Sequence, residues 1–257
     1  MTTRNKTKIN FLISDWPKGL VYTQSYLNKL GYNSDLVHHY VRSSWIESVG
    51  NGAFKKSNDT VDCYGALSAV QQQLGKNIYC GGKTSLSLQG ISHYIQLNQE
   101  TVYLFSPVKE NLPEWFLNHK KAWRFEFIRT NFLDYSVKDS FTSFKRNEYS
   151  FTISSNERAL LEILYLIPDR QGFDEAFKLM EMLPSLRPPV MQKLLVSCTS
   201  VKVNRLFMFM AKRLHYPWFD ELETDLIHLG SGKRQIIKNG KLDKEFLITV
   251  PEEYVND

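Results

Sequence analysis

The chain has 257 residues, of which 42% are hydrophobic and 13% aromatic, so it is long and apolar enough to bury a sizeable core and is not a disordered chain. It contains no apolar run close to the ~18–20 residues that span a bilayer, and its first residues are too polar for a secretion signal. Three widely spaced cysteines, Cys63, Cys80 and Cys198, form no CxxC pair and suit a reducing cytosol as small buried side chains. We therefore expect a cytoplasmic protein without membrane association, bound metal or cofactor.

The net charge of +5 is unevenly distributed along the chain. Residues 1–60 contain eight lysines and arginines against four acidic residues, residues 61–150 contain ten against eight, and residues 151–257 contain fourteen against fifteen. The basic excess therefore lies at the N-terminal end. It favours contact with phosphate there and a different role for the rest of the chain, although surface lysines alone can produce an excess of this size.

Residues 23–42 have the pattern of two helices joined by a glycine turn. Thr23 is suited to cap a first helix, and Gly31 then ends that helix because glycine takes a positive φ at little cost. Asn33 or Ser34 can cap a second helix. Its inner side would carry four apolar residues at helical spacing: Leu36, Val37, Tyr40 and Val41.

A short hairpin is expected directly after the second helix. Residues 45–49 read as a strand, residues 50–52 form a Gly-Asn-Gly turn, and the returning strand ends in Lys55 and Lys56. Helix, turn, helix and basic hairpin in this order predict a winged helix-turn-helix, in which the second helix enters the major groove of DNA and the hairpin contacts phosphate. The same pattern also fits a small helical subdomain that packs on another part of the protein.

The remaining chain mixes helices and short strands. Helical patterns cover residues 62–74, 84–88, 114–118, 156–164, 174–183, 190–198 and 204–214, with Thr84 able to cap the second of these. Strand patterns cover residues 77–79, 91–97 and 101–106 and recur within 122–153. At the end, residues 235–238 and 246–250, separated by Asn239-Gly240, read as a β-hairpin or as paired strands. The expected fold class is α+β: a winged helix-turn-helix domain with a helical extension over residues 1–95, then a mixed α/β C-terminal domain over residues 96–257.

Nine polar side chains are candidates for DNA contact. Those on the second helix would approach base edges, those that open the first helix would contact phosphate, and so would the two lysines of the hairpin. They are Thr23, Gln24, Ser34, Asp35, His38, His39, Arg42, Lys55 and Lys56. A solvated helix face is the simpler interpretation of His38-His39, and a metal site is disfavoured because adjacent helical residues point apart.

Two segments imitate a nucleotide-binding loop but lack essential residues. Residues 77–84 end in Gly-Lys-Thr but have Asn77 where the loop needs glycine. Residues 227–234 have Ile227 at that glycine and Arg234 where a hydroxyl belongs, so neither segment can hold ATP. The acidic stretch over residues 220–225 lacks the paired lysine of a metal-dependent nuclease, and no catalytic triad is indicated by spacing.

Basic residues recur in the C-terminal part. Lys202 and Arg205 fall near the start of an apolar helix, and Lys233 and Arg234 precede the last hairpin. They fit a basic face for an acidic partner or a nucleic acid, or surface cations that keep a hairpin soluble. We take Lys202, Arg205, Lys233 and Arg234 as candidates for a partner-binding surface.

Many short motifs make the chain resemble the AbiEi family, the antitoxins and autorepressors of AbiE-type (type IV) toxin–antitoxin systems. The resemblance covers nearly the whole chain, and it depends on the order of the motifs more than on any one of them. The N-terminal motifs are Trp16-Pro17-x-Gly19, the helix-turn-helix, Trp45-Ile46, Gly50-x-Gly52-Ala53, Gly65-Ala66-Leu67, Gln71-x-Gln73-Leu74-Gly75, Gly81-Gly82-x-Thr84 and Gly90-x-x-His93-Tyr94. The C-terminal motifs are residues 157–162, Phe173-Asp174-Glu175-Ala176, Leu186-Arg187-Pro188, residues 200–207 and residues 230–234.

The resemblance implies a role in phage defence by abortive infection. Proteins of this family bind inverted repeats in their own promoter through an N-terminal winged helix, and a C-terminal domain counteracts a toxin that resembles a nucleotidyltransferase. The second helix here departs from the more basic helix expected of relatives, because Arg42 is its one fixed cation. Operator affinity is therefore expected to be modest or helped by cooperative binding.

Three hypotheses of different classes remain. In the first, the chain is a DNA-binding antitoxin that represses its own operon and has no catalytic activity. In the second, the C-terminal domain is a protein-interaction module that sequesters the toxin directly, and DNA binding is secondary. In the third and weakest, the winged helix guides a nucleic-acid enzyme.

Overall fold

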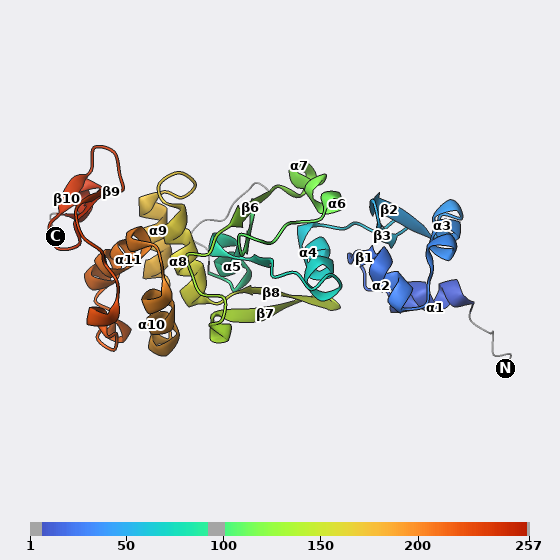
Figure 1. Cartoon of the computed structure of the whole chain (residues 1–257), viewed down its shortest axis with the longest axis horizontal. Helices are drawn as coiled ribbons and strands as arrows, with labels where there is room; N and C mark the ends of the chain where they lie inside the picture. The colour runs from blue at the N-terminus through green and yellow to red at the C-terminus, as the bar shows by residue number, and fades with distance from the viewer. Residues whose placement is uncertain (1–6, 92–100, 256–257) are drawn as a thin grey trace. The chain divides into compact units, whose positions relative to one another are not determined.

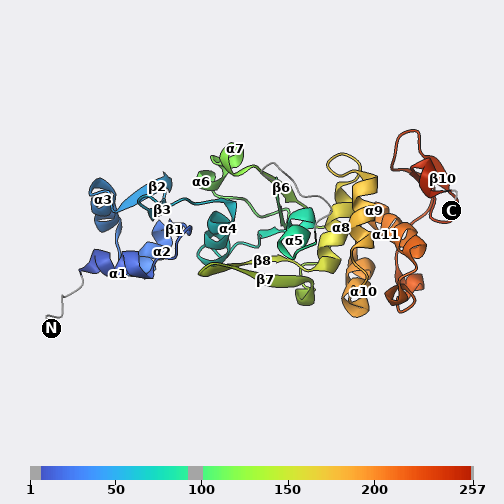
Figure 2. The same ribbon diagram turned by 180° about the vertical axis from the view of Figure 1, so that it is seen from behind.

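The structure is a computed structural model that describes residues 7–91 and 101–255, and it has the expected α+β fold (Figure 1; Figure 2). Of the strand predicted over residues 91–97, all but Ile91 lies outside the described residues. The helices are α1 (Lys8–Asp15), α2 (Gln24–Lys29), α3 (Ser34–Arg42), α4 (Cys63–Gln72), α5 (Gly82–Leu88), α6 (Glu114–Leu117), α7 (Lys120–Trp123), α8 (Asn156–Leu166), α9 (Phe173–Glu181), α10 (Pro188–Ser197) and α11 (Val201–Leu214). The strands are β1 (Tyr22–Thr23), β2 (Ile46–Gly50), β3 (Ala53–Lys56), β4 (Tyr79–Cys80), β5 (Val102–Ser106), β6 (Phe125–Arg129), β7 (Phe141–Arg146), β8 (Tyr149–Ser154), β9 (Arg234–Gln235), β10 (Lys241–Asp243) and β11 (Ile248–Val250).

The chain forms two compact units. The first unit comprises Met1–Tyr79, Gln99–Ile128 and Ser143–Thr152. The second comprises Cys80–Asn98, Arg129–Thr142 and Ile153–Asp257. The chain thus passes between the units several times. The two domains predicted from sequence are instead continuous, residues 1–95 and 96–257, and this division stays a prediction.

The first unit begins with the element order of a winged helix. After α1, strand β1 leads into α2 and α3, and the β2–β3 hairpin follows. The three strands form one antiparallel sheet in the order β1-β3-β2, in which Tyr22 pairs with Phe54 and Glu47 with Lys55. Trp16 is buried beneath it, stacks on Tyr22 at 4.1 Å between ring centroids, and donates its indole N–H to the Leu20 carbonyl at 2.8 Å.

Helix α4 packs closely on this part of the chain because two glycines meet. A Cβ atom on Gly65 would lie 1.8 Å from the carbonyl oxygen of Gly19, so only hydrogen fits there. Asp62 caps the helix by accepting from the N–H groups of Tyr64 and Gly65, each at 3.0 Å. At the other end, Gln73 Nε2 donates to the Val21 carbonyl at 2.7 Å, which ties α4 to the chain just before β1.

A five-stranded sheet has the order β6-β5-β4-β8-β7, with a parallel pairing between β4 and β8. In the second unit, α5 follows β4 and begins at Gly82 with no side-chain cap of its own. The carboxylate of Glu162 on α8 accepts the Gly82 N–H at 2.8 Å and the Ser154 hydroxyl at 2.7 Å. Thr84 therefore lies inside α5 and does not cap it, because a distant carboxylate satisfies the helix start.

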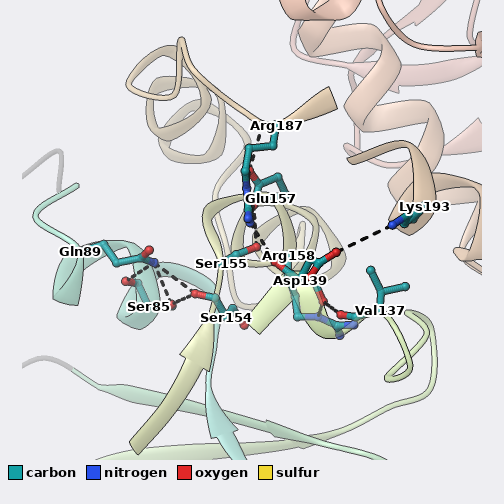
Figure 3. A network of polar contacts seen from close by, with 11 residues as sticks. Ser85, Gln89, Val137, Asp139, Ser154, Ser155, Glu157, Arg158, Arg187 and Lys193 are labelled. Atoms are coloured by element: carbon teal, nitrogen blue, oxygen red, sulfur yellow. Dashed lines mark hydrogen bonds and ion pairs between the residues drawn. The ribbon is translucent and has the colours of Figure 1, made fainter. Parts of the chain in front are cut away.

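The charged side chains of Glu157 and Arg158, near the start of α8, have their partners within the second unit (Figure 3). Glu157 accepts from the Arg187 N–H at 3.0 Å and from its guanidinium at 2.9 and 2.7 Å. The neighbouring Arg158 donates from Nε to Ser140 Oγ at 2.8 Å and from Nη2 to the Asp134 carbonyl. Both side chains are therefore held in the interior by donors and acceptors that match them.

Helices α8 to α11 form the hydrophobic core of the second unit. Helix α11, the apolar helix expected over residues 204–214, has nine buried residues among its fourteen. Of the two arrangements expected for the last strands, the structure has paired strands and no hairpin between β9 and β11: β10 pairs antiparallel with β11, and β9 pairs parallel with β11. Asn239-Gly240 still turns the chain, but the turn leads into β10 because Gly240 packs against the Val250 backbone.

The three cysteines are buried thiols, as expected. Burial raises the pKa of the Cys63 thiol and raises that of Cys198 to about 11, so neither is poised for chemistry as a thiolate. Across residues 7–91 and 101–255, no helix is long and apolar enough to cross a bilayer.

Candidate nucleic-acid interface

The turn between α2 and α3 is built as the sequence indicates. Thr23 caps α2 by accepting from the Tyr26 N–H at 3.3 Å. Gly31 follows the helix with φ +85°, a conformation that costs glycine little. Asn33, the first of the two predicted caps, accepts from the Leu36 N–H at 3.0 Å and starts α3. Local caps and one glycine thus fix the angle at which α3 leaves the turn.

One face of α3 is open to solvent. Val37 and Tyr40 are buried on the inner side, and the five predicted contact residues lie together on the outer side: Ser34, Asp35, His38, His39 and Arg42. None of these five side chains makes a hydrogen bond or ion pair with the chain's described residues. This face therefore presents a carboxylate, a guanidinium, a hydroxyl and two imidazoles whose hydrogen-bonding capacity is unused.

The start of α2 is less available than predicted. Thr23 is only 3% exposed, its hydroxyl donates to Gln73 Oε1 at 3.1 Å, and its N–H donates to the same oxygen at 2.8 Å. The N–H of Gln24 donates to the Gly52 carbonyl at 2.8 Å, and its side-chain amide bonds Asn28 at 2.9 Å. The hydroxyl and N–H of Thr23, which we expected to contact phosphate, bind Gln73 at the end of α4 instead. Of Thr23 and Gln24, only the half-buried side chain of Gln24 stays a candidate.

The two lysines lie at the base of the hairpin and not at its tip. Lys55 forms an ion pair with Glu47 at 2.8 Å and donates to the Asp59 carbonyl at 2.7 Å. The hydrogen bond from Lys55 keeps the pKa of Glu47 below its usual value. Lys56 donates to the Trp16 carbonyl at 2.6 Å. Both cations are half-buried and already bound within the first unit, which weakens their case as phosphate contacts.

The hairpin packs on α6 through Gly50, the last residue of β2. A Cβ atom on Gly50 would lie 2.6 Å from Cβ of Trp115 on α6, so this end of β2 lies directly on that helix. Asn51 at the turn is exposed. The hairpin is therefore braced beside its turn and bound through its lysines at its base.

Sequence reasoning missed two exposed side chains beside the hairpin base, Trp45 and Lys18. Trp45 is 47% exposed and, with Lys18 and Lys56, lines an open pocket of about 460 Å³. The signal was present in the sequence, because a tryptophan at the end of an amphipathic helix and before a strand has no place in either apolar stripe. The exposed ring of Trp45 and the exposed Lys18 can contact sugar or phosphate.

The four C-terminal candidates divide into two pairs. Arg205 is 2% exposed and donates to the carbonyls of Leu229, Gly232 and Leu247 at 2.6, 2.6 and 3.2 Å. Lys202 donates to the carbonyls of Tyr165 and Ile167 at 2.7 and 2.5 Å. The prediction that Arg205 lies on a partner-binding surface is therefore wrong, because its side chain is interior and bonded to three carbonyls. The ammonium group of Lys202 is likewise bonded to carbonyls of its own unit.

The other pair is on the surface. Lys233 and Arg234 are exposed, and their side chains make no hydrogen bond or ion pair within the described ranges of the chain. Those ranges also contain no group of three or more histidine, cysteine or acidic side chains that could hold a metal ion.

Two family models match this chain. The family model described as "Transcriptional regulator, AbiEi antitoxin N-terminal domain" matches residues 5–97, and "Transcriptional regulator, AbiEi antitoxin, Type IV TA system" matches residues 99–251. Among curated proteins the comparison gives no match.

One solved structure is similar over most of its length: the crystal structure of the RV2827C protein from Mycobacterium tuberculosis, with a TM-score of 0.64 and 10% sequence identity. The alignment covers 93% of this chain and 88% of that one. At this identity the likeness concerns the fold alone. The two family models, by contrast, together span nearly the whole sequence and describe regulators and antitoxins, which are not a class of enzyme. The chain belongs to the AbiEi family of transcriptional regulators and antitoxins of type IV toxin–antitoxin systems.

Proposed function

We propose that this protein is a cytoplasmic antitoxin that represses its own operon. Its winged helix would bind inverted repeats in its own promoter, and its C-terminal part, residues 96–257, would counteract a toxin that resembles a nucleotidyltransferase. The observation that carries the DNA-binding half is the exposed face of α3, where five polar side chains share one side of a helix and none is used internally. Unused donors and acceptors on a capped second helix are what base recognition requires.

The chemistry of α3 suggests how the face would read DNA. Arg42 can donate two hydrogen bonds to the N7 and O6 of guanine, and Asp35 can accept from the amino group of cytosine. Ser34, His38 and His39 can bond either base edges or phosphates. With one fixed cation and one fixed anion, the face has little net charge, so selectivity would come from hydrogen bonds and most affinity from cations elsewhere.

A titration of the purified protein against the DNA immediately upstream of its gene, followed by gel shift at two salt concentrations, tests this proposal. We expect a shifted complex that unrelated competitor DNA displaces poorly. The complex should weaken steeply as salt rises, because phosphate contacts release counterions. Absence of a complex at low salt, or equal binding of unrelated duplexes, would contradict repression through α3.

Direct toxin binding is the second candidate function. Lys233 and Arg234 favour it, because they are exposed, unpaired within the described chain and adjacent on β9 and the loop before it. If this pair binds the toxin, the two proteins co-purify, and Lys233→Glu with Arg234→Glu abolishes the complex. Lys238→Glu with Lys244→Glu is the matched control, since both are exposed cations of the same segment. Failure of the wild-type protein and the toxin to associate at micromolar concentrations would exclude sequestration.

A further inference from the structure

We propose that α6 and α7 form a second phosphate-binding surface for duplex DNA, beside the braced wing. This inference depends on the proposed DNA binding by α3, and it assigns the non-specific part of the affinity to three cations of α7 and its end: Lys120, Lys121 and Arg124. These residues belong to the part of the chain that matches the C-terminal family model, yet they lie in the same compact unit as the winged helix.

The first observation is continuity with the wing. In both views the β2–β3 hairpin lies between α3 and α6, and α7 follows α6 on that far side (Figure 1; Figure 2). The contact between Gly50 and Trp115 fixes the end of β2 on α6. A pocket of about 260 Å³ is lined jointly by hairpin residues, including Ser48 and Val49, and by His119 and Trp123. A duplex that extends past the wing tip would meet this segment next.

The second observation is that α7 is held rigidly. Trp123 is buried, donates its indole N–H to the Val61 carbonyl at 3.2 Å, and stacks on His119 with ring centroids 4.4 Å apart. Phe116 packs edge-on against Trp123 at 5.1 Å and against Phe125 at 5.0 Å. Buried aromatic rings on both sides of the cations therefore keep their backbone in place, which reduces the entropy lost when a phosphate binds.

The third observation is the exposure and arrangement of the cations. All three are exposed, and together with Asn118 and Thr101 they line an open hollow of about 530 Å³. Lys120 has an ion pair with Glu126 at 3.5 Å, but both side chains are well exposed, so a phosphate can displace the carboxylate. Arg124 has φ +45°, in the left-handed region where glycine or asparagine usually ends a helix.

Duplex DNA fits this surface better than a compact ligand does. The hollow is open, and three cations on long, flexible stems outnumber its one carboxylate, Glu126. This arrangement suits a row of phosphates and not an enclosed small molecule. Lys55 and Lys56 are bound internally, so phosphate contacts beside the hairpin would need other cations. The α7 cluster has three exposed cations at the position where a flanking phosphate backbone would run.

Salt-dependent binding of the full chain to its upstream DNA, measured by fluorescence anisotropy, tests the inference. The variant replaces Lys120, Lys121 and Arg124 with glutamine, and the matched control replaces three other exposed lysines with glutamine: Lys109, Lys138 and Lys145. For the α7 variant we expect the slope of log Kd against log salt to fall by about 2–3, since each lost phosphate contact removes about one unit. Affinity at about 0.1 M salt should fall roughly tenfold or more, with the preference for the promoter over a scrambled duplex unchanged, because phosphate contacts carry no sequence information.

The outcomes separate this inference from the function on which it rests. If the α7 variant and the control keep the wild-type slope and affinity, the second surface is refuted while repression through α3 stands. If both variants lose the same affinity, the effect is one of total charge and the assignment to α7 is overturned. If wild-type protein binds no upstream DNA, the proposed function fails together with the inference. Unchanged thermal unfolding of the α7 variant would exclude misfolding as the cause.

Discussion

Arg42 on α3 and Arg158 on α8 are the same side chain in opposite surroundings. Arg42 is exposed and bonds to nothing within the described chain. Arg158 is 1% exposed, donates to Ser140 and to the Asp134 carbonyl, and has its guanidinium carbon 4.3 Å from the centre of the Phe141 ring. The donors of Arg42 are therefore available to a partner, whereas Arg158 uses its donors for hydrogen bonds within the fold.

The contrast shows how to separate functional from structural charges in this protein. A buried cation must satisfy its donors internally, because an unpaired charge in the interior is far more costly than one in water. An exposed cation gains little from an internal partner and can stay unpaired at almost no cost. Internal partners, more than residue type, therefore indicate which of the predicted cations are available to DNA or to a toxin.

The largest effect is expected for Arg158→Ala. The substitution leaves Ser140 Oγ and the Asp134 carbonyl without their donor and opens a void beside Phe141. Loss of packing and of two buried hydrogen bonds should lower the free energy of unfolding by about 3–5 kcal/mol. Urea unfolding followed by circular dichroism measures this. A loss below about 1 kcal/mol would mean that the interior arginine is dispensable to the fold.

A somewhat smaller loss, about 2–4 kcal/mol, is expected for Arg205→Ala. Three carbonyls of the C-terminal segment would lose their donor, and the loop that carries Lys233 and Arg234 would be released from α11. Arg234→Ala is the matched control and should change stability by no more than about 0.5 kcal/mol, because its side chain is exposed. Equal effects of the two substitutions would contradict an interior role for Arg205.

A pH-dependent loss is expected for Arg187→Ala. Burial alone would raise the pKa of Glu157, but hydrogen bonds from Arg187 and Ser155 outweigh it and hold that pKa below its usual value. A carboxyl with a lowered folded pKa contributes stability above its unfolded pKa of about 4.3 and loses it as pH falls through the folded value. The variant should therefore lose about 1.5–3 kcal/mol at pH 7 and progressively less below about pH 4. Thermal unfolding across pH 3–7 checks this, and a deficit independent of pH would exclude the carboxylate as its source.

Local signals made the helix-turn-helix predictable from sequence. The cap at Thr23, the positive φ at Gly31 and the cap at Asn33 each depend on a few neighbouring residues. The outer face of α3 followed from helical periodicity, which places residues 34, 35, 38, 39 and 42 together. What could be predicted is therefore the part of the candidate site whose geometry is set within one turn of the chain.

Long-range packing decided what the sequence could not show. The brace between Gly50 and Trp115 joins residues 65 positions apart, and no local pattern marks it. Asn239-Gly240 is a good hairpin signal, yet the parallel pairing of β9 with β11 overrode it. Arg205 did give a clue, because a charged side chain in a helix that is apolar on all sides must find internal partners.

The smallest effect on stability and the sharpest effect on binding are expected for Arg42→Ala. Since Arg42 is exposed and bonded to nothing within the described chain, its removal should change the free energy of unfolding by less than about 0.5 kcal/mol. Loss of a guanidinium that reads a base should nevertheless weaken promoter binding about tenfold and reduce the preference over scrambled DNA. Arg42→Lys distinguishes the two possible contacts, since lysine restores a phosphate contact but not a bidentate hydrogen bond to guanine. Full recovery of affinity by lysine, with the preference for the promoter unchanged in both variants, would place Arg42 on phosphate. A preference that is reduced in Arg42→Ala and stays reduced in Arg42→Lys would place it on a base.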